Sequence, residues 1–309
     1  MSAPLAGTFG LRRPGWRRYR RLGWGLFFVS PWLVGFLAFV VAPILASLYF
    51  SLTRYDVLTP PRFVGLENYR ELLDDRVYWQ AVHNTLFYVV FAVPGHALVG
   101  FGLAYLLNRR LPARPLWRTI FFLPAIVPAV AAATIWAWIY NSEFGLLNGL
   151  LNSFGIASVP WLSSESLVKP SLIAISLWSS GAVMVIYLAA LQDVPQHLYE
   201  AARIDGASWH HELRYLTVPL VSPATVFVLV TGLIGAFQYF TFPYLLTRGG
   251  PANASLFYPL YLYFNSFQWF KMGYAAAMAW IMFVLTVLCA VALFRSSARW
   301  AYYQGDERS

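Results

Sequence analysis

Six long runs of apolar residues, none with a Lys, Arg, Asp or Glu in its interior, constrain this chain more than any other feature of its sequence. They cover residues 22–50, 82–107, 119–140, 170–191, 219–242 and 272–294. A helix needs roughly 20 apolar residues to cross the hydrocarbon core of a bilayer. With 59% hydrophobic and 11% charged residues, the chain has too little polar surface for a soluble fold. The runs therefore predict an all-α integral membrane protein with about six transmembrane helices.

The first apolar run follows a cluster of arginines, as the apolar core of a secretory signal peptide follows its basic end. The run is about twice as long as such a core, roughly 7–15 residues, and no small-residue cleavage pattern ends it. We therefore expect a retained membrane helix. The predicted organisation is a basic cytoplasmic N-terminal segment at 1–21, a transmembrane region at 22–295 and a cytoplasmic tail at 296–309.

Lys and Arg are unevenly distributed between the two sides of the predicted spans. Six precede the first span, four lie at 108–118, two lie at 192–218 and three follow the last span, which makes fifteen of the 22. Cytoplasmic loops carry the excess of basic residues in membrane proteins, so both termini are predicted to be cytoplasmic. The net charge of +9 is then a topology signal, and nucleic acid is not an expected partner.

The loop at 192–218 carries the most specific pattern of the sequence. Pro195 suits the first position of a helix, and Gly206 suits the left-handed position just past a helix end. The loop therefore predicts two short helices that meet at a bend. Pro219 is expected to open the fifth span.

The first of these short helices has a small, nearly flat apolar face. Leu198, Ala201 and Ala202 lie three and four residues apart, so they share one side of the helix. Glu200 and Asp205 flank this side and can accept charge-assisted hydrogen bonds from a partner. Another protein can approach such a helix closely, which predicts docking of the helix into a groove. The alternative is an amphipathic helix that rests on the inner headgroup layer.

The spacing of this loop resembles the EAA loop of ABC-importer permeases. The resemblance rests on Glu200-Ala201-Ala202, Asp205-Gly206-Ala207, Leu216 and Pro219. Segments 63–69 and 246–251, and Gly145 with Asn148, are similar to outer-loop signatures of the sugar and glycerol-phosphate permeases, the maltose type included. Arg248 departs from that pattern, where the family often has another glycine.

The resemblance implies a type I ABC-importer permease architecture in a bacterial or archaeal cell (inner) membrane. Two permease chains, expected to be a heterodimer, would form an alternating-access pathway for a carbohydrate. Each would present its EAA loop to one of two cytoplasmic ATPase subunits that bind ATP and Mg, and an extracytoplasmic solute-binding protein would deliver the solute. The residues that would couple to the ATPase are Glu200, Ala201, Ala202, Asp205, Gly206 and Ala207.

A carbohydrate pathway needs polar and aromatic side chains at membrane depth. Gln238 and Tyr239 in the fifth span are the first candidates, followed by Asn84, Tyr187 and Asn265. The alternative for each is a polar side chain that bonds to a neighbouring helix, which is common inside membranes.

The chain lacks the patterns of an enzyme. Neither lysine, Lys169 or Lys271, follows a glycine-rich phosphate-binding loop, so no ATP hydrolysis is expected on this chain. His210-His211-Glu212 lacks the spacing of a zinc-protease helix, and the single cysteine, Cys289, lies in an apolar run. We predict no catalytic residue, no metal site and no cofactor in this chain.

Three other functions stay open at this point. A glycerol-phosphate importer permease fits the same resemblance. A stand-alone secondary transporter would need an ionisable residue within the membrane, and His96 is the candidate. A membrane-embedded enzyme would have to use the carboxylates of the 192–218 loop, namely Asp193, Glu200, Asp205 and Glu212.

Overall fold

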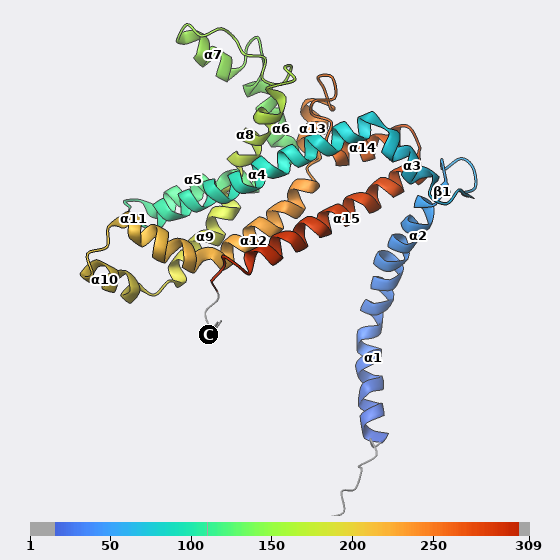
Figure 1. Ribbon diagram of the computed structural model, residues 1–309, viewed down its shortest axis with the longest axis horizontal. Helices are drawn as coiled ribbons and strands as arrows, with labels where there is room; N and C mark the ends of the chain where they lie inside the picture. Colours follow the sequence, from blue (N-terminus) through green and yellow to red (C-terminus); the bar gives the residue numbers. More distant parts are fainter. Residues whose placement is uncertain (1–15, 110, 303–309) are drawn as a thin grey trace, which may run out of the picture. The chain divides into compact units, whose positions relative to one another are not determined.

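The computed structural model describes residues 16–109 and 111–302, and Figure 1 shows their course. Residues 1–15 of the predicted N-terminal segment and 303–309 of the predicted tail lie outside the described residues. The chain forms two compact units, Met1–Phe50 and Ser51–Ser309.

The first unit contains one long helix in three segments: α1 (Trp16–Phe36), the π-helical η1 (Leu37–Val41) and α2 (Ala42–Ser51). Pro43 explains the wide turn at η1, because proline has no N–H to donate and its ring opposes the carbonyl four residues earlier. The amide of Ala42 instead bonds the carbonyl of Leu37, five residues back. The helix begins before the predicted boundary at residue 22.

The second unit begins with a short antiparallel hairpin of β1 (Thr53–Arg54) and β2 (Arg62–Phe63), followed by helices. Before the 192–218 loop these are α3 (Glu67–Asp74), α4 (Arg76–Asn108), α5 (Arg114–Ile126), α6 (Ala129–Ile139), α7 (Leu146–Ser153), α8 (Val168–Trp178) and α9 (Gly181–Asp193). The loop contributes α10 (Gln196–Ile204), α11 (Trp209–His211) and the π-helical η2 (Glu212–Thr217). After it come α12 (Val218–Phe237), α13 (Thr241–Leu246), α14 (Tyr258–Tyr263), the π-helical η3 (Phe264–Gln268) and α15 (Met272–Ser297).

Four helices of the described chain are long and apolar enough to cross a membrane, and six if each of two bent pairs counts as one span. The four are Gly25–Ser51, Arg76–Asn108, Trp209–Leu246 and Met272–Ser297. The bent pairs are α5 with α6 and α8 with α9. The all-α fold with about six transmembrane helices is therefore confirmed.

The bent pairs correct the prediction that 119–140 and 170–191 are single helices. α5 and α6 meet at 98° because Pro128 forces the preceding Val127 into an extended conformation. α8 and α9 meet at 50° across Ser179 and Ser180. The hydroxyls of these serines donate to the carbonyls of Ser176 and Leu177, which satisfies acceptors at the end of α8.

Two glycines permit close approach of helices in the second unit, in which α4 packs against α8, α9, α12 and α14. A Cβ at Gly100 of α4 would lie 2.5 Å from Cγ1 of Val183 on α9. A Cβ at Gly181 would lie 2.2 Å from the carbonyl oxygen of Phe121 on α5, so the backbones of α5 and α9 nearly touch. Small residues permit such approach between membrane helices.

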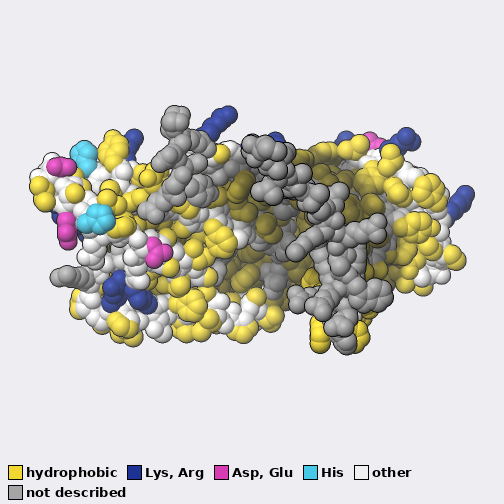
Figure 2. Space-filling model, turned by 90° about the horizontal axis from the view of Figure 1, so that it is seen from below, with side chains coloured by type: hydrophobic (Ala, Val, Ile, Leu, Met, Phe, Trp, Pro, Cys, Tyr) yellow, Lys and Arg dark blue, Asp and Glu magenta, His cyan; other side chains and the backbone are white. Residues whose placement is uncertain are grey.

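Charged side chains lie mainly toward the two ends of the face shown in Figure 2, and the described side chains visible between them are mostly hydrophobic. In Figure 1, α10 and α11 lie at one end of the second unit, and α3 with the β1–β2 hairpin lies at the other. This distribution is that of a membrane protein whose apolar middle faces lipid or other apolar partners.

Candidate functional site

The helix α10 is built from local signals of the sequence. Pro195 is its N-cap, with φ −62° and ψ 128°, one position earlier than predicted. The helix ends at Ile204, and Asp205 is its C-cap. Because none of its residues is buried, α10 is held by its ends and by a few side-chain contacts.

Gly206 closes α10 in the left-handed conformation that was predicted, with φ +79°. The amide of Gly206 bonds the carbonyl of Arg203 at 3.1 Å, and the amide of Ala207 bonds that of Ala202 at 2.9 Å. This pair of bonds is the Schellman motif, which satisfies the last carbonyls of a helix and turns the chain sharply. A Cβ at Gly206 would meet no atom within 4 Å, so backbone conformation, and not space, favours glycine there.

The segment after the bend differs from the predicted second short helix. α11, η2 and α12 follow one another without interruption, so the helix of the fifth span begins at Trp209 and not at Pro219. Pro219 lies in the first turn of α12, and the π turns of η2 precede it. The amide of Val218 donates to the carbonyl of Leu213, five residues back. Such a π-helical bond is expected where a proline disturbs the α-helical hydrogen-bond pattern.

Two side-chain contacts attach α10 to this long helix. Nε of Arg203 donates to Oε1 of Glu212 at 2.8 Å, and Nη2 lies 3.4 Å from Oε2. The hydrogen bond and charge of Glu212 raise the pKa of Arg203. The hydroxyls of Tyr199 and Thr217 share a second bond at 3.1 Å. The short helix and the start of the fifth span are thus joined across the bend.

The exposed side of α10 is not quite the side that was predicted. Leu198 and Ala202 are half-buried, so they turn toward the rest of the chain. Ile204 is 87% exposed, and Glu200, Ala201, Asp205 and Gly206 are exposed with it. In the described chain the carboxylates of this side form no ion pair. An isolated apolar side chain between free carboxylates is suited to contact with another protein.

Gln238 and Tyr239 lie where the fifth span is interrupted, between α12 and α13. Gln238 is the C-cap of α12 and its side chain is exposed. The ring of Tyr239 stacks on that of Tyr88, with 4.1 Å between centroids, and its hydroxyl donates to the carbonyl of Leu172 at 3.3 Å. Gln238 is therefore exposed at the interruption, whereas Tyr239 is held between helices.

The other three predicted pathway residues are buried. Asn84 is 2% exposed, and its amide donates to the carbonyls of Asn253 and Leu256. Asn265 is 1% exposed and bonds the carbonyl of Tyr261 in its own helix, and Tyr187 is 1% exposed. All three side chains are thus enclosed by the chain itself, the amide of Asn84 against a loop and that of Asn265 against its own helical segment.

The structure also brings together residues that the sequence did not relate to one another. Nζ of Lys169 on α8 donates to Oδ1 of Asn84 at 3.1 Å and lies 5.0 Å from the ring centroid of Phe87. Oγ of Ser180, at the bend between α8 and α9, lies 3.0 Å from Nδ1 of His96. No spacing in the sequence relates these pairs, because their members are more than eighty residues apart.

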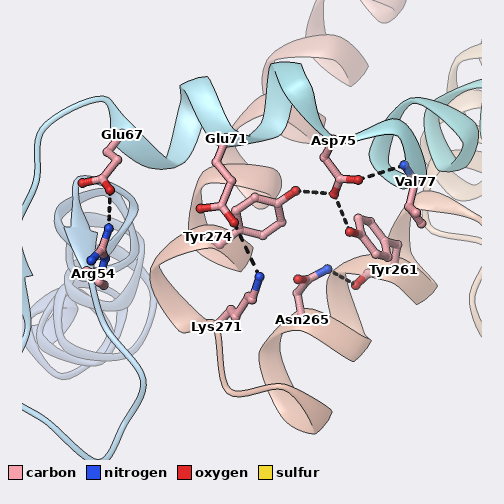
Figure 3. A network of polar contacts seen from close by, with 9 residues as sticks. All are labelled: Arg54, Glu67, Glu71, Asp75, Val77, Tyr261, Asn265, Lys271 and Tyr274. Atoms are coloured by element: carbon pink, nitrogen blue, oxygen red, sulfur yellow. Dashed lines mark hydrogen bonds and ion pairs between the residues drawn. The ribbon is translucent and has the colours of Figure 1, made fainter.

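A cluster around Asp75 joins three helices at the end opposite α10 (Figure 3). Oδ1 of Asp75 caps α4 by accepting from the amide of Val77 at 2.8 Å. Oδ2 accepts from the hydroxyls of Tyr261 on α14 at 2.5 Å and Tyr274 on α15 at 2.6 Å. Burial opposes ionisation of Asp75, but these hydrogen bonds outweigh it and lower the pKa of the carboxyl.

Two ion pairs lie beside this cluster in Figure 3, between Arg54 and Glu67 and between Lys271 and Glu71 at 3.5 Å. All four side chains are at least half exposed, so the pairs add little to stability. The cluster therefore depends mainly on the buried hydroxyl groups around Asp75.

Comparison with known proteins gives consistent matches over most of the chain. Residues 96–301 match the family described as the binding-protein-dependent transport system inner membrane component. The "Probable ABC transporter permease protein YesP" of Bacillus subtilis is 38% identical over 288 residues, which cover 92% of this chain and 93% of that protein. The "Trehalose/maltose transport system permease protein MalF" of Thermococcus litoralis is 33% identical over 272 residues, or 87% and 92% of the two chains.

A solved structure has the same fold. A chain of a bacterial alginate ABC transporter, crystallised in complex with an alginate pentasaccharide-bound periplasmic protein, superposes with a TM-score of 0.81 at 21% identity. The match covers 93% of this chain and 98% of that one. The chain therefore belongs to the family of binding-protein-dependent transport system inner membrane components, the ABC-importer permeases that its 192–218 loop resembles.

Proposed function

We propose that this chain is one of two permease subunits of an ATP-driven importer and forms half of the pathway for a carbohydrate. The observation that carries the proposal is the geometry of α10, an exposed short helix fixed by a left-handed glycine and tied by Arg203 and Glu212 to a membrane-spanning helix. A helix in this position transfers motion of a bound ATPase into the membrane. Glu200, Ala201, Ala202, Asp205, Gly206 and Ala207 make up the contact.

The carbohydrate is supported by the named solutes of relatives. One of them is a lactose transport system permease protein and another is a sulfoquinovosyl glycerol transport system permease protein. Gln238 suits this solute class, since an exposed amide in a helix interruption can both donate and accept hydrogen bonds to hydroxyls. The other partners are a second, different permease chain, two ATPase subunits that hold ATP and Mg, and an extracytoplasmic binding protein.

The orientation follows from the positions of the basic residues. Arg109 follows α4, Arg114 and Arg118 lie on α5, and Arg203 lies on α10, so the α4–α5 connection and the α10 loop are cytoplasmic in our proposal. The Asp75 cluster then lies on the outer side, where a binding protein delivers solute. Both termini face the cytoplasm.

The test exploits a matched pair of glycines. Gly206 and Gly155 both have positive φ, +79° and +76°, and a Cβ at either position would meet no atom within 4 Å. A leucine at Gly206 would strain the left-handed backbone by about 1–2 kcal/mol and distort the bend. We therefore expect the Gly206→Leu chain to insert into the membrane normally. It should no longer recover the ATPase in a pull-down, and uptake should fall at least about tenfold. Gly155→Leu should retain both the recovery of the ATPase and the uptake. Normal uptake and ATPase recovery in Gly206→Leu would refute the docking proposal.

A further inference from the structure

Lys169 is a half-buried cation in the first turn of α8, and no carboxylate of the described chain pairs with it. Its Nζ donates to Oδ1 of Asn84 at 3.1 Å and lies 5.0 Å from the ring centroid of Phe87. Both of these partners are neutral. Glu165, four residues earlier in the sequence, is exposed and forms no ion pair with a described residue. The positive charge of Lys169 therefore has no counterion in the part of the chain that the structure describes.

The second lysine of the chain shows what Lys169 lacks. Lys271 also lies over an aromatic ring, with 5.6 Å between Nζ and the ring centroid of Tyr274, but its Nζ is 3.5 Å from a carboxylate oxygen of Glu71. An ammonium group has three donors and a full charge, whereas a single amide oxygen accepts one bond and neutralises no charge. Because the side chain of Lys169 is only half-buried, its remaining donors are open to an anion from outside the described chain.

The charge of Lys169, more than its hydrogen bond, requires an explanation. A cation is unfavourable in the first turn of a helix, because the positive end of the helix dipole lies there. A glutamine could donate the same bond to Asn84 without a charge. Lysines at a membrane edge commonly extend toward water and headgroups, but Nζ here turns to Asn84, which is 2% exposed. The ammonium is therefore directed toward the bundle and not toward lipid.

The position of Lys169 relates it to the interruption of the fifth span. The carbonyl of Leu172, three residues later in α8, accepts a hydrogen bond from the hydroxyl of Tyr239 at 3.3 Å. The ring of Tyr239 stacks on that of Tyr88 on α4, and Gln238, the exposed amide of the interruption, immediately precedes Tyr239. Lys169 is therefore about one helical turn, roughly 5 Å along α8, from the point where the interruption contacts this helix.

From this arrangement we infer that Lys169 binds the acidic group of the transported solute, so that the solute is an anionic carbohydrate. The inference rests on the proposed function and adds the class of solute to it. The ammonium donates charge-assisted hydrogen bonds to a carboxylate, sulfate or phosphate group, and the amide of Gln238 bonds hydroxyls of the sugar. A neutral sugar would leave the charge of Lys169 without a counterion.

The experiment measures solute binding to the membrane complex of both permeases and the ATPases in phosphatidylcholine nanodiscs. The binding protein is left out, so that its own selectivity does not contribute. The probes are glucuronate, glucose 6-sulfate and glucose 6-phosphate, each compared with neutral glucose by saturation-transfer NMR. In wild type we expect at least one acidic probe to bind about tenfold or more tightly than glucose, as one charge-assisted hydrogen bond allows.

Two variants and a matched control locate this preference. Lys169→Gln should lose the preference for the acidic probe, and Lys169→Arg should keep most of it, because arginine also presents a positive charge and several donors. The control is Lys271→Gln, which removes the lysine that already has a carboxylate partner. It should change the affinity for the acidic probe less than about twofold.

Acetylation of lysine gives a second measurement on wild type, which decides even if Lys169→Gln does not accumulate. The chain has two lysines, Lys169 and Lys271, so mass spectrometry can follow each one separately. The acidic probe that binds most tightly should slow acetylation of Lys169 at least severalfold, because it covers the ammonium. Glucose should not slow it, and neither probe should change the acetylation of Lys271.

Each of the following outcomes would overturn the inference. If wild type binds no acidic probe more tightly than glucose, the pathway does not select charge, and the importer proposal then stands or falls on the Gly206→Leu test alone. An acid preference that persists in Lys169→Gln, or equal slowing of acetylation at both lysines, would mean that the anion binds elsewhere. Loss of the binding protein from the Lys169→Gln complex, with unchanged binding of the acidic probes, would assign the lysine to a protein contact.

Discussion

Nε of Arg203 lies 2.8 Å from Oε1 of Glu212, and this ion pair joins α10 to the helix that crosses the membrane as α12. The arginine side chain is 66% exposed, whereas that of Glu212 is 14% exposed, so the carboxylate is fixed and the guanidinium reaches it from the surface. The pair fixes the position of α10 more than it stabilises the fold, because exposed ion pairs contribute at most about 1 kcal/mol.

Exchange of these charges provides the first prediction. Arg203→Glu should reduce uptake severalfold at unchanged membrane insertion, because Glu212 then repels α10. Arg203→Glu with Glu212→Arg should recover a large part of the uptake, measured in intact cells or in ATP-loaded vesicles that contain the complete importer and its binding protein. The reverse order, with the double variant less active than the single one, would show that the residues act separately.

The contact of α5 with α9 gives the second prediction. Gly181→Ala should destabilise the folded chain by about 1–3 kcal/mol or prevent its accumulation, because the new methyl group meets the backbone of Phe121. Gly102→Ala on α4 is the control, since no atom lies within 4 Å of its Cβ position. Thermal unfolding in detergent, followed by tryptophan fluorescence, should separate the two variants. Equal stability would mean that the two helices can move apart without cost.

The Asp75 cluster predicts a dependence of stability on pH. The folded-state pKa of Asp75 is lowered from the ordinary 3.8, so its contribution is complete above that pH and is lost as pH falls through the lower folded-state pKa. Burial and the hydrogen bond to Asp75 raise the pKa of Tyr261 from 10.0 to about 12, so its contribution is lost as pH rises through that range.

Asp75→Asn should therefore lower stability at pH 7 by about 2 kcal/mol, the loss expected when a charged hydrogen-bond acceptor is removed. The difference from wild type should shrink in acid, as the wild-type carboxyl becomes protonated. Melting temperatures of both proteins, measured in one detergent from pH 7 down into the acid range, would give this difference in stability. A difference that does not change with pH would show that the charge of Asp75 is irrelevant.

Gln238 and Asn84 should respond oppositely to the same replacement. Gln238→Leu should lower uptake at unchanged stability, because its exposed amide bonds nothing in the described chain. Asn84→Leu should lower stability by about 1–3 kcal/mol, because the carbonyls of Asn253 and Leu256 and the ammonium of Lys169 lose their partner. Uptake and melting temperature measured on both variants distinguish a pathway residue from an internal one.

Local signals in the sequence were sufficient for much of this structure. The apolar runs predicted the membrane helices, since length and composition decide whether a segment can cross a bilayer. Gly206 predicted the left-handed bend, because few other residues adopt that conformation at low cost.

Features that depend on distant contacts were not predicted. The bend at Ser179 and Ser180 lies inside an uninterrupted apolar run, and its geometry depends on the approach of Gly181 to α5. The exposed side of α10 was only partly predicted, because the bonds of Tyr199 and Arg203 to the following helix set its rotation. The enclosure of Asn84 likewise depends on a loop about 170 residues later.

The unbroken passage from α11 through η2 into α12 makes the fifth span a lever. Its arm from Trp209 to Phe237 is about 40 Å long at 1.5 Å per residue. A tilt of about five degrees imposed at the α10 end would move the opposite end by about 3–4 Å, roughly the width of one side chain. Gln238 stands at the tip of this arm. In the proposed function, a small movement at the α10 end is then enough to present its amide to the solute or withdraw it.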